Sequence, residues 1–149
     1  EPYCVKLSGG RWYMLARSVE KGRLLLYSLD RLEHVRTTEQ KFELPRDFVA
    51  KDYFADFFGI VIDENVPLQR IVLQADKYHQ YYMRTLPMHH SQRELFSCDD
   101  YADFELTLRP TYDFYMRLMS WGNMIKVLEP QSLQDELCKW LRKTMEVYE

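Results

Sequence analysis

The sequence predicts an α+β protein, with short strands in the first third of the chain and alternating strands and helices in its second half. Three observations support this class. Side chains in the first third fit the two-residue period of strands, glycine-containing turns separate those runs, and the second half alternates between strand and helix periods. With 149 residues, 46% of them hydrophobic, the chain suits one or two small domains.

The first third reads as a series of strands joined by tight turns. The predicted strands cover residues 2–8, 11–18 and 23–29. Glycines at Gly9-Gly10 and at Gly22 mark the turns between them. One face of the middle strand carries Arg11, Tyr13, Leu15 and Arg17, and the other carries Trp12, Met14 and Ala16. Several short strands in succession favour a small β-barrel.

A helix and a polar linker follow the strands. Phe54, Phe57 and Phe58 have helical spacing and Gly59 stands where a helix would end, so we predict a helix over about 51–58. Residues 63–67 are polar and contain a proline, which is typical of a linker. The sequence therefore predicts two domains, one over residues 1–62 and one over residues 68–149.

The second domain alternates between strand and helix patterns. Strands are predicted over 70–75, 93–97, 103–109 and 124–128, and helices over 77–85, 112–120 and 130–148. Asp76 and Thr111 are expected to cap the first two helices, and Gly122 to end the second. The order β-α-β-β-α-β with a final helix is the ferredoxin-like pattern.

Composition excludes several classes of protein. The net charge is −3, but residues 1–41 hold eight basic and five acidic residues, so the first third carries +3 and the remainder −6. This asymmetry permits an anion site in the first third, but charge alone favours a mixed solvated surface. Three widely spaced cysteines do not form a disulfide framework or a zinc motif and indicate a reducing cytoplasm. We expect no cofactor and no metal.

Neither a membrane protein nor an enzyme is expected. No run approaches 18 apolar residues, and no signal peptide is visible. No nucleophile, P-loop or metalloprotease motif is present. The chain starts inside a predicted strand without Met, and we expect it to be part of a longer protein.

Segments spread over nearly the whole chain resemble the WYL family of bacterial transcriptional regulators, in the family's order. The matching segments are Trp12-Tyr13-Met14, with Met in place of the Leu of the naming motif, Tyr27 to Leu32, Asp52 to Ile60, Pro87 to Gln92, Trp121-Gly122, and Val127 to Pro130 with Leu133. Residues 1–62 resemble a WYL domain without its first strand, and residues 68–149 resemble the WCX extension that follows it.

The resemblance implies a fold and a function. It implies an Sm-like or SH3-like barrel followed by a ferredoxin-like domain. It also implies a cytoplasmic module that senses a ligand and forms a homodimer, while a helix-turn-helix domain outside this chain binds DNA. The effector would be a nucleotide or a short single-stranded nucleic acid in a basic, aromatic channel. The alternative is a structural dimerisation module without a ligand.

Five residues are candidate ligand contacts. Tyr13 lies between arginines on one strand face, which suits base stacking beside phosphate binding, although an outer, solvated strand face would look the same. Arg31 matches the family's Asp-Arg pair and would hold a phosphate, unless Asp30, Glu33 or Asp52 pairs with it. The predicted ligand-binding residues are Arg11, Tyr13, Arg17, Arg31 and His90.

Other positions carry weaker or contrary expectations. The family often places a basic residue where this chain has Leu25, so one cation commonly assigned to the channel is absent. Trp12 is expected in the barrel core. His34 and His79 are expected at the surface, and His90 is expected to shape a domain interface or the channel wall. Adjacent histidines on an extended segment point to opposite faces, which argues against a metal site at His89-His90.

Overall fold

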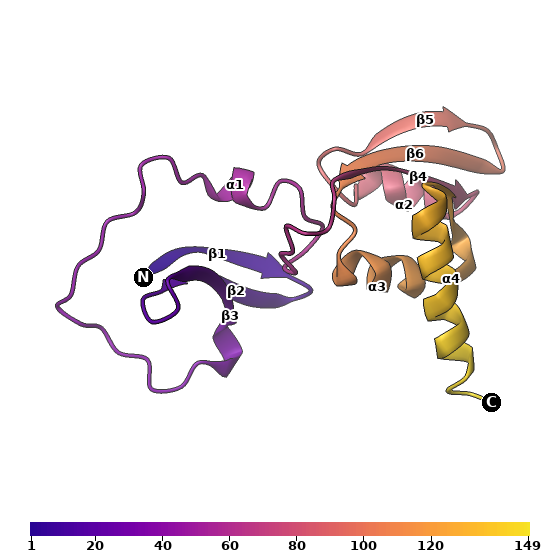
Figure 1. The fold of residues 1–149 in the computed structure, drawn as a ribbon. Coiled ribbons are helices and arrows are strands. Elements are labelled where there is room, and N and C mark those ends of the chain that lie inside the picture. Colours follow the sequence, from indigo (N-terminus) through magenta and orange to yellow (C-terminus); the bar gives the residue numbers. More distant parts are fainter. The chain divides into compact units, whose positions relative to one another are not determined.

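The computed structural model describes residues 1–149 and divides into two compact units, Glu1–Tyr53 and Phe54–Glu149 (Figure 1). The elements are β1 (Pro2–Ser8), β2 (Arg11–Ser18), β3 (Arg23–Ser28), the 3-10 helix η1 (Leu29–Arg31), α1 (Ala50–Tyr53), β4 (Gln69–Asp76), α2 (His79–Thr85), β5 (Arg93–Ser97), β6 (Tyr101–Leu108), α3 (Tyr112–Ser120), the 3-10 helix η2 (Gly122–Met124), β7 (Ile125–Glu129) and α4 (Gln131–Met145). Two antiparallel sheets with separate helices confirm the α+β class. None of the helices combines the length and apolarity needed to cross a bilayer.

The first unit is built on a three-stranded antiparallel sheet in the order β1-β2-β3. Gly9 and Gly10 both have positive φ, at 55° and 77°, as the central residues of a tight hairpin turn require. This turn sets Ser8 opposite Arg11. The three predicted strands are therefore confirmed, and the chain after β3 turns into η1.

Full burial in this sheet is confined to two adjacent residues of β2, one on each face of the sheet. Leu15 is 1% exposed and Ala16 5%, and they are the unit's only fully buried hydrophobic side chains. Val5, Leu7 and Trp12 are 57%, 55% and 52% exposed, and Leu7 lies directly across from Trp12. The expectation that Trp12 packs in a core is wrong, because no segment of the chain covers this tryptophan on its face of β2.

The second unit contains a four-stranded antiparallel sheet in the order β5-β6-β4-β7 (Figure 1). Alternate residues of β4 and β6, such as Leu73 and Phe104, point to one face and are fully buried. Met83 of α2, Phe114 of α3 and Leu133 of α4 belong to the same core cluster. These helices therefore cover that face, and the predicted order of strands and helices in this half of the chain is confirmed.

Residues 54–66, here called the strap, belong to the second unit and not to a helix. The prediction of a helix over 51–58 is correct only at its start, because α1 covers Ala50–Tyr53 and residues 54–58 are not helical. The backbone beyond it is drawn into contacts with the end of β6. The N–H of Arg109 donates to the carbonyl of Asp56 at 2.7 Å, and Phe57 forms a bridge with Arg109. Phe57 is 6% exposed, so tertiary burial has replaced the helical pairing that its spacing suggested.

Arg109 and Asp113 fasten the strap at two further points. The guanidinium of Arg109 donates to the carbonyls of Glu64 and Val66, at 3.1 and 2.6 Å. The carboxylate of Asp113 accepts hydrogen bonds from the N–H groups of Ile60 and Val61, at 2.8 and 3.1 Å. The strap is therefore held through its main chain, which fixes its path independently of most of its side chains.

Gly59 is required where the strap meets α3. A Cβ atom at this position would overlap the carboxylate of Asp113. Beside it, the ring of Phe58 packs edge-on against Phe114, with 5.6 Å between centroids. Thr111 was expected to cap α3 by accepting a hydrogen bond, but its hydroxyl instead donates to Asp113 at 2.7 Å. The segment Phe58-Gly59-Ile60 thus packs against the first turn of α3.

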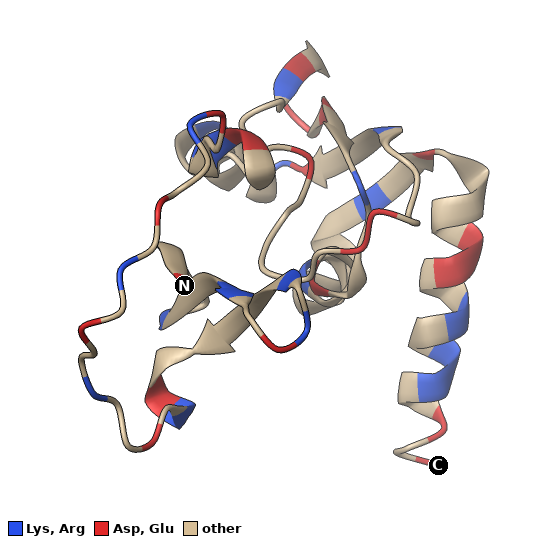
Figure 2. Cartoon of the chain, turned by 60° about the vertical axis from the view of Figure 1, so that its left-hand side comes forward, with Lys and Arg blue, Asp and Glu red and all other residues tan.

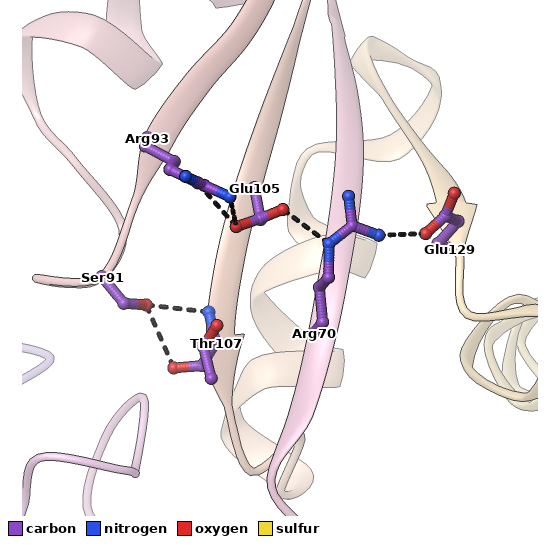
Figure 3. A network of polar contacts seen from close by, with 6 residues as sticks. All are labelled: Arg70, Ser91, Arg93, Glu105, Thr107 and Glu129. Carbon is purple, nitrogen blue, oxygen red and sulfur yellow. Dashed lines mark hydrogen bonds and ion pairs between the residues drawn. The ribbon is translucent and has the colours of Figure 1, made fainter.

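The opposite face of the four-stranded sheet is polar (Figure 3). Glu105 is 7% exposed and receives hydrogen bonds from Arg93 at 2.6 Å and from Arg70 at 2.5 Å, and Arg70 also pairs with Glu129. The guanidinium groups of Arg93 and Arg70 hold the pKa of Glu105 below its ordinary value. Ser91 and Thr107 exchange two hydrogen bonds nearby. On this face two arginines and two carboxylates thus form one ion-pair network.

His79 is buried, which corrects the expectation that it lies at the surface. It is 6% exposed, and its ring packs against Trp121 at 4.4 Å and Tyr82 at 5.5 Å. Its Nε2 atom has no hydrogen-bond partner. Burial lowers the pKa of His79, an effect that Asp76 partly opposes. Asp76 was expected to cap α2, but the helix begins at His79 with Tyr78 at its N-cap position. The Asp76 carboxylate accepts hydrogen bonds from the N–H groups of Tyr78 and His79, at 3.0 and 2.7 Å, in the turn ahead of the helix.

Candidate functional site

The four candidate residues of the first unit lie on one face of the sheet and on the short helix that follows it. Arg11, Tyr13 and Arg17 alternate along β2, and Arg31 ends η1, which packs against β2. Leu15 is fully buried between Tyr13 and Arg17. Since a strand rises about 3.3 Å per residue, Arg11 and Arg17 are about 20 Å apart along it. The candidates therefore fall into two groups, one at each end of β2, and do not form a single cluster.

Arg11, Asp30 and Arg31 make up one end. Arg11 pairs with Asp30 at 3.4 Å, and both side chains are about half exposed. A hydrogen bond from the Ser28 hydroxyl holds the pKa of Asp30 below its ordinary value, and Arg11 and Arg31 add to this effect. Arg31 itself makes no ion pair within residues 1–149. Two cations thus flank one carboxylate, which leaves this end with net positive charge.

Arg17 forms the other end with the first residue of the chain. Its guanidinium lies 3.6 Å from the Glu1 carboxylate, and the backbones of the two residues exchange hydrogen bonds at 2.9 and 3.1 Å. Leu24 lies opposite Arg17 on β3. The charge of Arg17 is therefore matched locally, and this end has less to offer an anion than the Arg31 end.

Lys6 is a functional candidate that the sequence reasoning did not single out. It lies directly across from Tyr13 on β1, on the same face of the sheet. The signal was present, because a two-residue turn at Gly9-Gly10 makes residues 6 and 13 partners. Cys4 lies two residues before Lys6 on the same face of β1, and burial raises the pKa of its thiol. Tyr13 thus has Lys6 on one side and Ser28 on the other.

A cavity in the first unit has the wrong charge for an anion. It measures about 370 Å³, and its lining includes Tyr3, Leu24, Phe48 and two carboxylates, Asp47 and Asp52. The ring of Tyr3 packs edge-on against Phe48 at 4.9 Å. None of the four candidate residues of this unit lines the cavity. An anionic effector would therefore bind on the open face beside Arg31 and Tyr13 and not in this hollow.

His90 lies in the second unit, in the loop between α2 and β5. It is exposed, and its ring centroid is 4.2 Å from that of the buried His89. The neighbouring Gln92 has a structural role, because its amide donates to the carbonyl of Met83 at 2.6 Å and accepts from the N–H of Met88 at 2.8 Å. His90 is thus presented to solvent by a loop that Gln92 holds in place.

Charges of both signs alternate along the chain (Figure 2). In the second unit the three arginines on β4, α2 and β5 are paired with carboxylates, at Arg70, Arg84 and Arg93. The first unit has the unpaired Arg31. Arg23, Arg36 and Arg46 of the first unit are also exposed without an ion pair, so Arg31 differs from them by lying on the helix that packs against β2.

Comparison with known proteins identifies both parts of the chain. The family model described as "WCX domain" matches residues 67–145, and the one described as "WYL domain" matches residues 1–37. Among solved structures, the chain is similar to proteasome accessory factor B/C (PafBC) of Arthrobacter aurescens, at 21% identity and a TM-score of 0.37. That alignment covers 92% of this chain and 20% of the other, so this chain spans a fifth of that protein's length.

A search of curated proteins found no match. The WCX match spans more than half of the chain, and the WYL match precedes it without overlap. Both matches fall on the segments whose motifs resemble the same two domains in the same order. The chain therefore belongs to the WCX family and carries WYL-domain sequence ahead of its WCX domain.

Proposed function

We propose that this chain is the ligand-sensing and dimerisation module of a bacterial helix-turn-helix transcriptional regulator. Its effector would be a nucleotide or a short single-stranded nucleic acid. The DNA-binding domain would lie outside this chain, in a longer protein. The pairing of WYL and WCX sequence supports the regulatory role. No catalytic role is proposed for any residue.

One observation carries the choice of an anionic effector. Arg31 is the only arginine among the candidates without an ion pair, and it ends a helix that packs against the strand of Tyr13. An unpaired guanidinium can bind a phosphate through two parallel hydrogen bonds. A tyrosine ring on the adjacent strand can stack on a base. Lys6, across from Tyr13, adds a second cation to this face.

An effector regulates such a protein only through a difference in affinity. It must bind the DNA-competent arrangement of the regulator more or less tightly than the incompetent one. An exposed site at the end of β2, assembled from two strands and η1, would be sensitive to how those elements pack. We propose that Arg11, Tyr13, Arg17 and Arg31 contact the effector, with His90 at the channel wall or a domain interface.

The finer fold assignments also belong to this proposal. We propose that residues 1–62 form part of an Sm-like or SH3-like barrel and that residues 68–149 form a ferredoxin-like domain. Counted within the second unit, the strands run in the order second, third, first, fourth, all antiparallel, which supports the latter. We propose in addition a homodimer and a cytoplasmic location, and the three cysteines without disulfide bonds favour the reducing compartment.

Fluorescence anisotropy of labelled short single-stranded DNA and RNA tests the effector class. The chain should bind one of them at low salt, and the affinity should fall as salt rises, because phosphate contacts release counterions. Arg31→Ala should weaken binding about tenfold, the loss expected for one charge-assisted contact. Arg36→Ala is the matched control, since Arg36 is also exposed and also has no ion pair.

Equal losses for Arg31→Ala and Arg36→Ala would mean that only net charge matters, and the site proposal would fail. Absence of binding to either nucleic acid at low salt would exclude an oligonucleotide effector for this chain. A specific observation favours the alternative, a dimerisation module without a ligand: Arg11 and Arg17 already have carboxylate partners, and Leu25 replaces a common cation. Analytical ultracentrifugation of the same variants would then report the dimer independently.

A further inference from the structure

A groove of about 450 Å³ opens between α3 and α4 in the second unit. Its lining includes Tyr112, Met116 and Met119 from α3, and Trp140, Lys143 and Tyr148 from α4 or just beyond it. The spacing of these residues places them on one face of each helix. The volume falls within the range of about 300–1,000 Å³ that is typical of small-molecule sites, whose walls are mostly apolar and aromatic.

The aromatic wall of this groove is held in place from behind. The indole N–H of Trp140 donates to Glu136 at 3.0 Å, and the ring stacks on Tyr115 with 5.0 Å between centroids. Tyr112 lies 5.5 Å from the same ring. Hydrogen bonds from Lys139 and Trp140 keep the pKa of Glu136 below its ordinary value, so the acceptor stays charged. A ring fixed in this way loses little freedom when a ligand packs on it.

Lys143 is the only charged residue among those that line the groove. Unlike Lys139, which pairs with Glu136 at 2.9 Å, it makes no ion pair within residues 1–149. An ammonium group at the rim of an apolar groove attracts an anion and repels a cation. The groove therefore combines an apolar floor, a fixed aromatic wall and one cation that makes no ion pair.

We propose that this groove binds a small amphiphilic carboxylate, an aliphatic or aromatic acid. Its apolar part lies against Met116, Met119 and Trp140, and its carboxylate faces Lys143. Methionine side chains adapt to ligands of different shape, which suits a site that accepts a class of acids. The proposal is independent of the effector site on β2 and gives the WCX domain a binding site of its own.

Titration of the full chain with decanoate, kept below the concentration at which it forms micelles, tests this site. Isothermal titration calorimetry should show saturable binding with one site per chain. Decyltrimethylammonium, which has the same chain length and the opposite charge, should bind much more weakly. With carbon-13-labelled methionine methyl groups, the NMR signals of Met116 and Met119 should move on binding, and that of Met14, in the first unit, should not.

Two charge variants make the test specific. Lys143→Gln should weaken decanoate binding about fivefold, the factor expected for an exposed charge contact. Arg142→Gln is the matched control, because Arg142 is exposed on the same helix and does not line the groove. Met116→Glu should abolish binding; Met116 is 41% exposed, and circular dichroism would show whether the fold is kept.

Three results would overturn the proposal. One is the absence of saturable binding by the wild-type chain, and another is equal binding of the anionic and cationic probes. The third is a concentration-dependent dimer that Met116→Glu dissociates, with the Met116 and Met119 signals following dilution and not decanoate. That result would assign the groove to a second copy of the chain. Failure of nucleic-acid binding to the β2 face would leave all of these outcomes unchanged.

Discussion

The two units bury their hydrophobic residues very differently. The second unit has one continuous core, to which the sheet contributes Leu73 and Phe104 and the helices contribute Met83, Phe114 and Leu133. The first unit fully buries only Leu15 and Ala16 and leaves large apolar side chains such as Val5, Leu7 and Trp12 exposed. Burial of apolar area is the main favourable term in folding, so most of the stability of this chain resides in residues 54–149.

The two units also differ in the charged and apolar side chains that they leave unpaired or exposed. In the second unit, the arginines on β4, α2 and β5 (Arg70, Arg84 and Arg93) are in ion pairs, and the helices cover one face of the sheet. The first unit retains Arg31 without an ion pair and exposes Val5, Leu7 and Trp12 at one end of its sheet. Groups left unpaired or uncovered in a folded chain are candidates for binding. The comparison can be tested by perturbing the core, the strap and the buried histidine in turn.

The largest effect is expected from the core of the second unit. Phe104→Ala should reduce the free energy of unfolding by about 3–5 kcal/mol, because Phe104 is 1% exposed and its loss leaves a cavity. Phe96→Ala is the control on the neighbouring strand, where the ring is 50% exposed, and should cost about 1 kcal/mol or less. Urea unfolding followed by circular dichroism measures both. Similar losses for the two variants would contradict the assignment of the core.

An intermediate effect is expected where the strap meets α3. Gly59→Ala should cost about 1–3 kcal/mol, because the added methyl group overlaps the Asp113 carboxylate. The same substitution in an Asp113→Ala background should cost much less, since the overlapping group is gone. This double-mutant cycle is measured by thermal or urea unfolding. Additive costs would show that the two residues do not meet.

The smallest effect concerns pH and His79. Its folded-state pKa lies below the ordinary value of 6.5, so the unfolded chain binds a proton more readily near that pH. Stability from this group is therefore complete above about pH 6.5 and is lost as pH falls toward the folded-state pKa. Wild-type protein should lose stability between pH 7 and 5 more steeply than His79→Gln. The exposed His34→Gln should keep the wild-type slope, and a slope unchanged in His79→Gln would refute the assignment.

Much of the fold was predictable because local signals and tertiary structure agree in most elements. The glycine turn at Gly9-Gly10 fixes the β1–β2 register, and the Asp76 carboxylate binds the backbone of the turn ahead of α2. The exceptions are residues whose environment is set by distant parts of the chain. Phe57 has helical spacing but is buried by a bridge to Arg109, and the burial of His79 depends on Trp121. Periodicity in a sequence does not contain these long-range contacts.

The candidate site was predictable only in part. Alternation along β2 placed Arg11, Tyr13 and Arg17 on one face, as the strand pairing requires. It did not indicate that Asp30 would pair with Arg11 or that Glu1 would pair with Arg17, because ion pairs between strands depend on register and rotamer. The position of Lys6 across from Tyr13 could have been predicted from the register that the Gly9-Gly10 turn sets. Which carboxylate each exposed arginine pairs with could not be predicted from the sequence.

The strap has a consequence for how this protein can be cut and recombined. A fragment that starts at Leu68 lacks the backbone partners of Arg109 and of the Asp113 carboxylate, and it uncovers the ring of Phe114 that Phe58 packs against. A fragment that starts at Phe54 keeps all of these. Chimeras that exchange the C-terminal half between WCX-domain proteins should therefore be joined ahead of Phe54, where α1 ends, and not within the polar linker over residues 63–67.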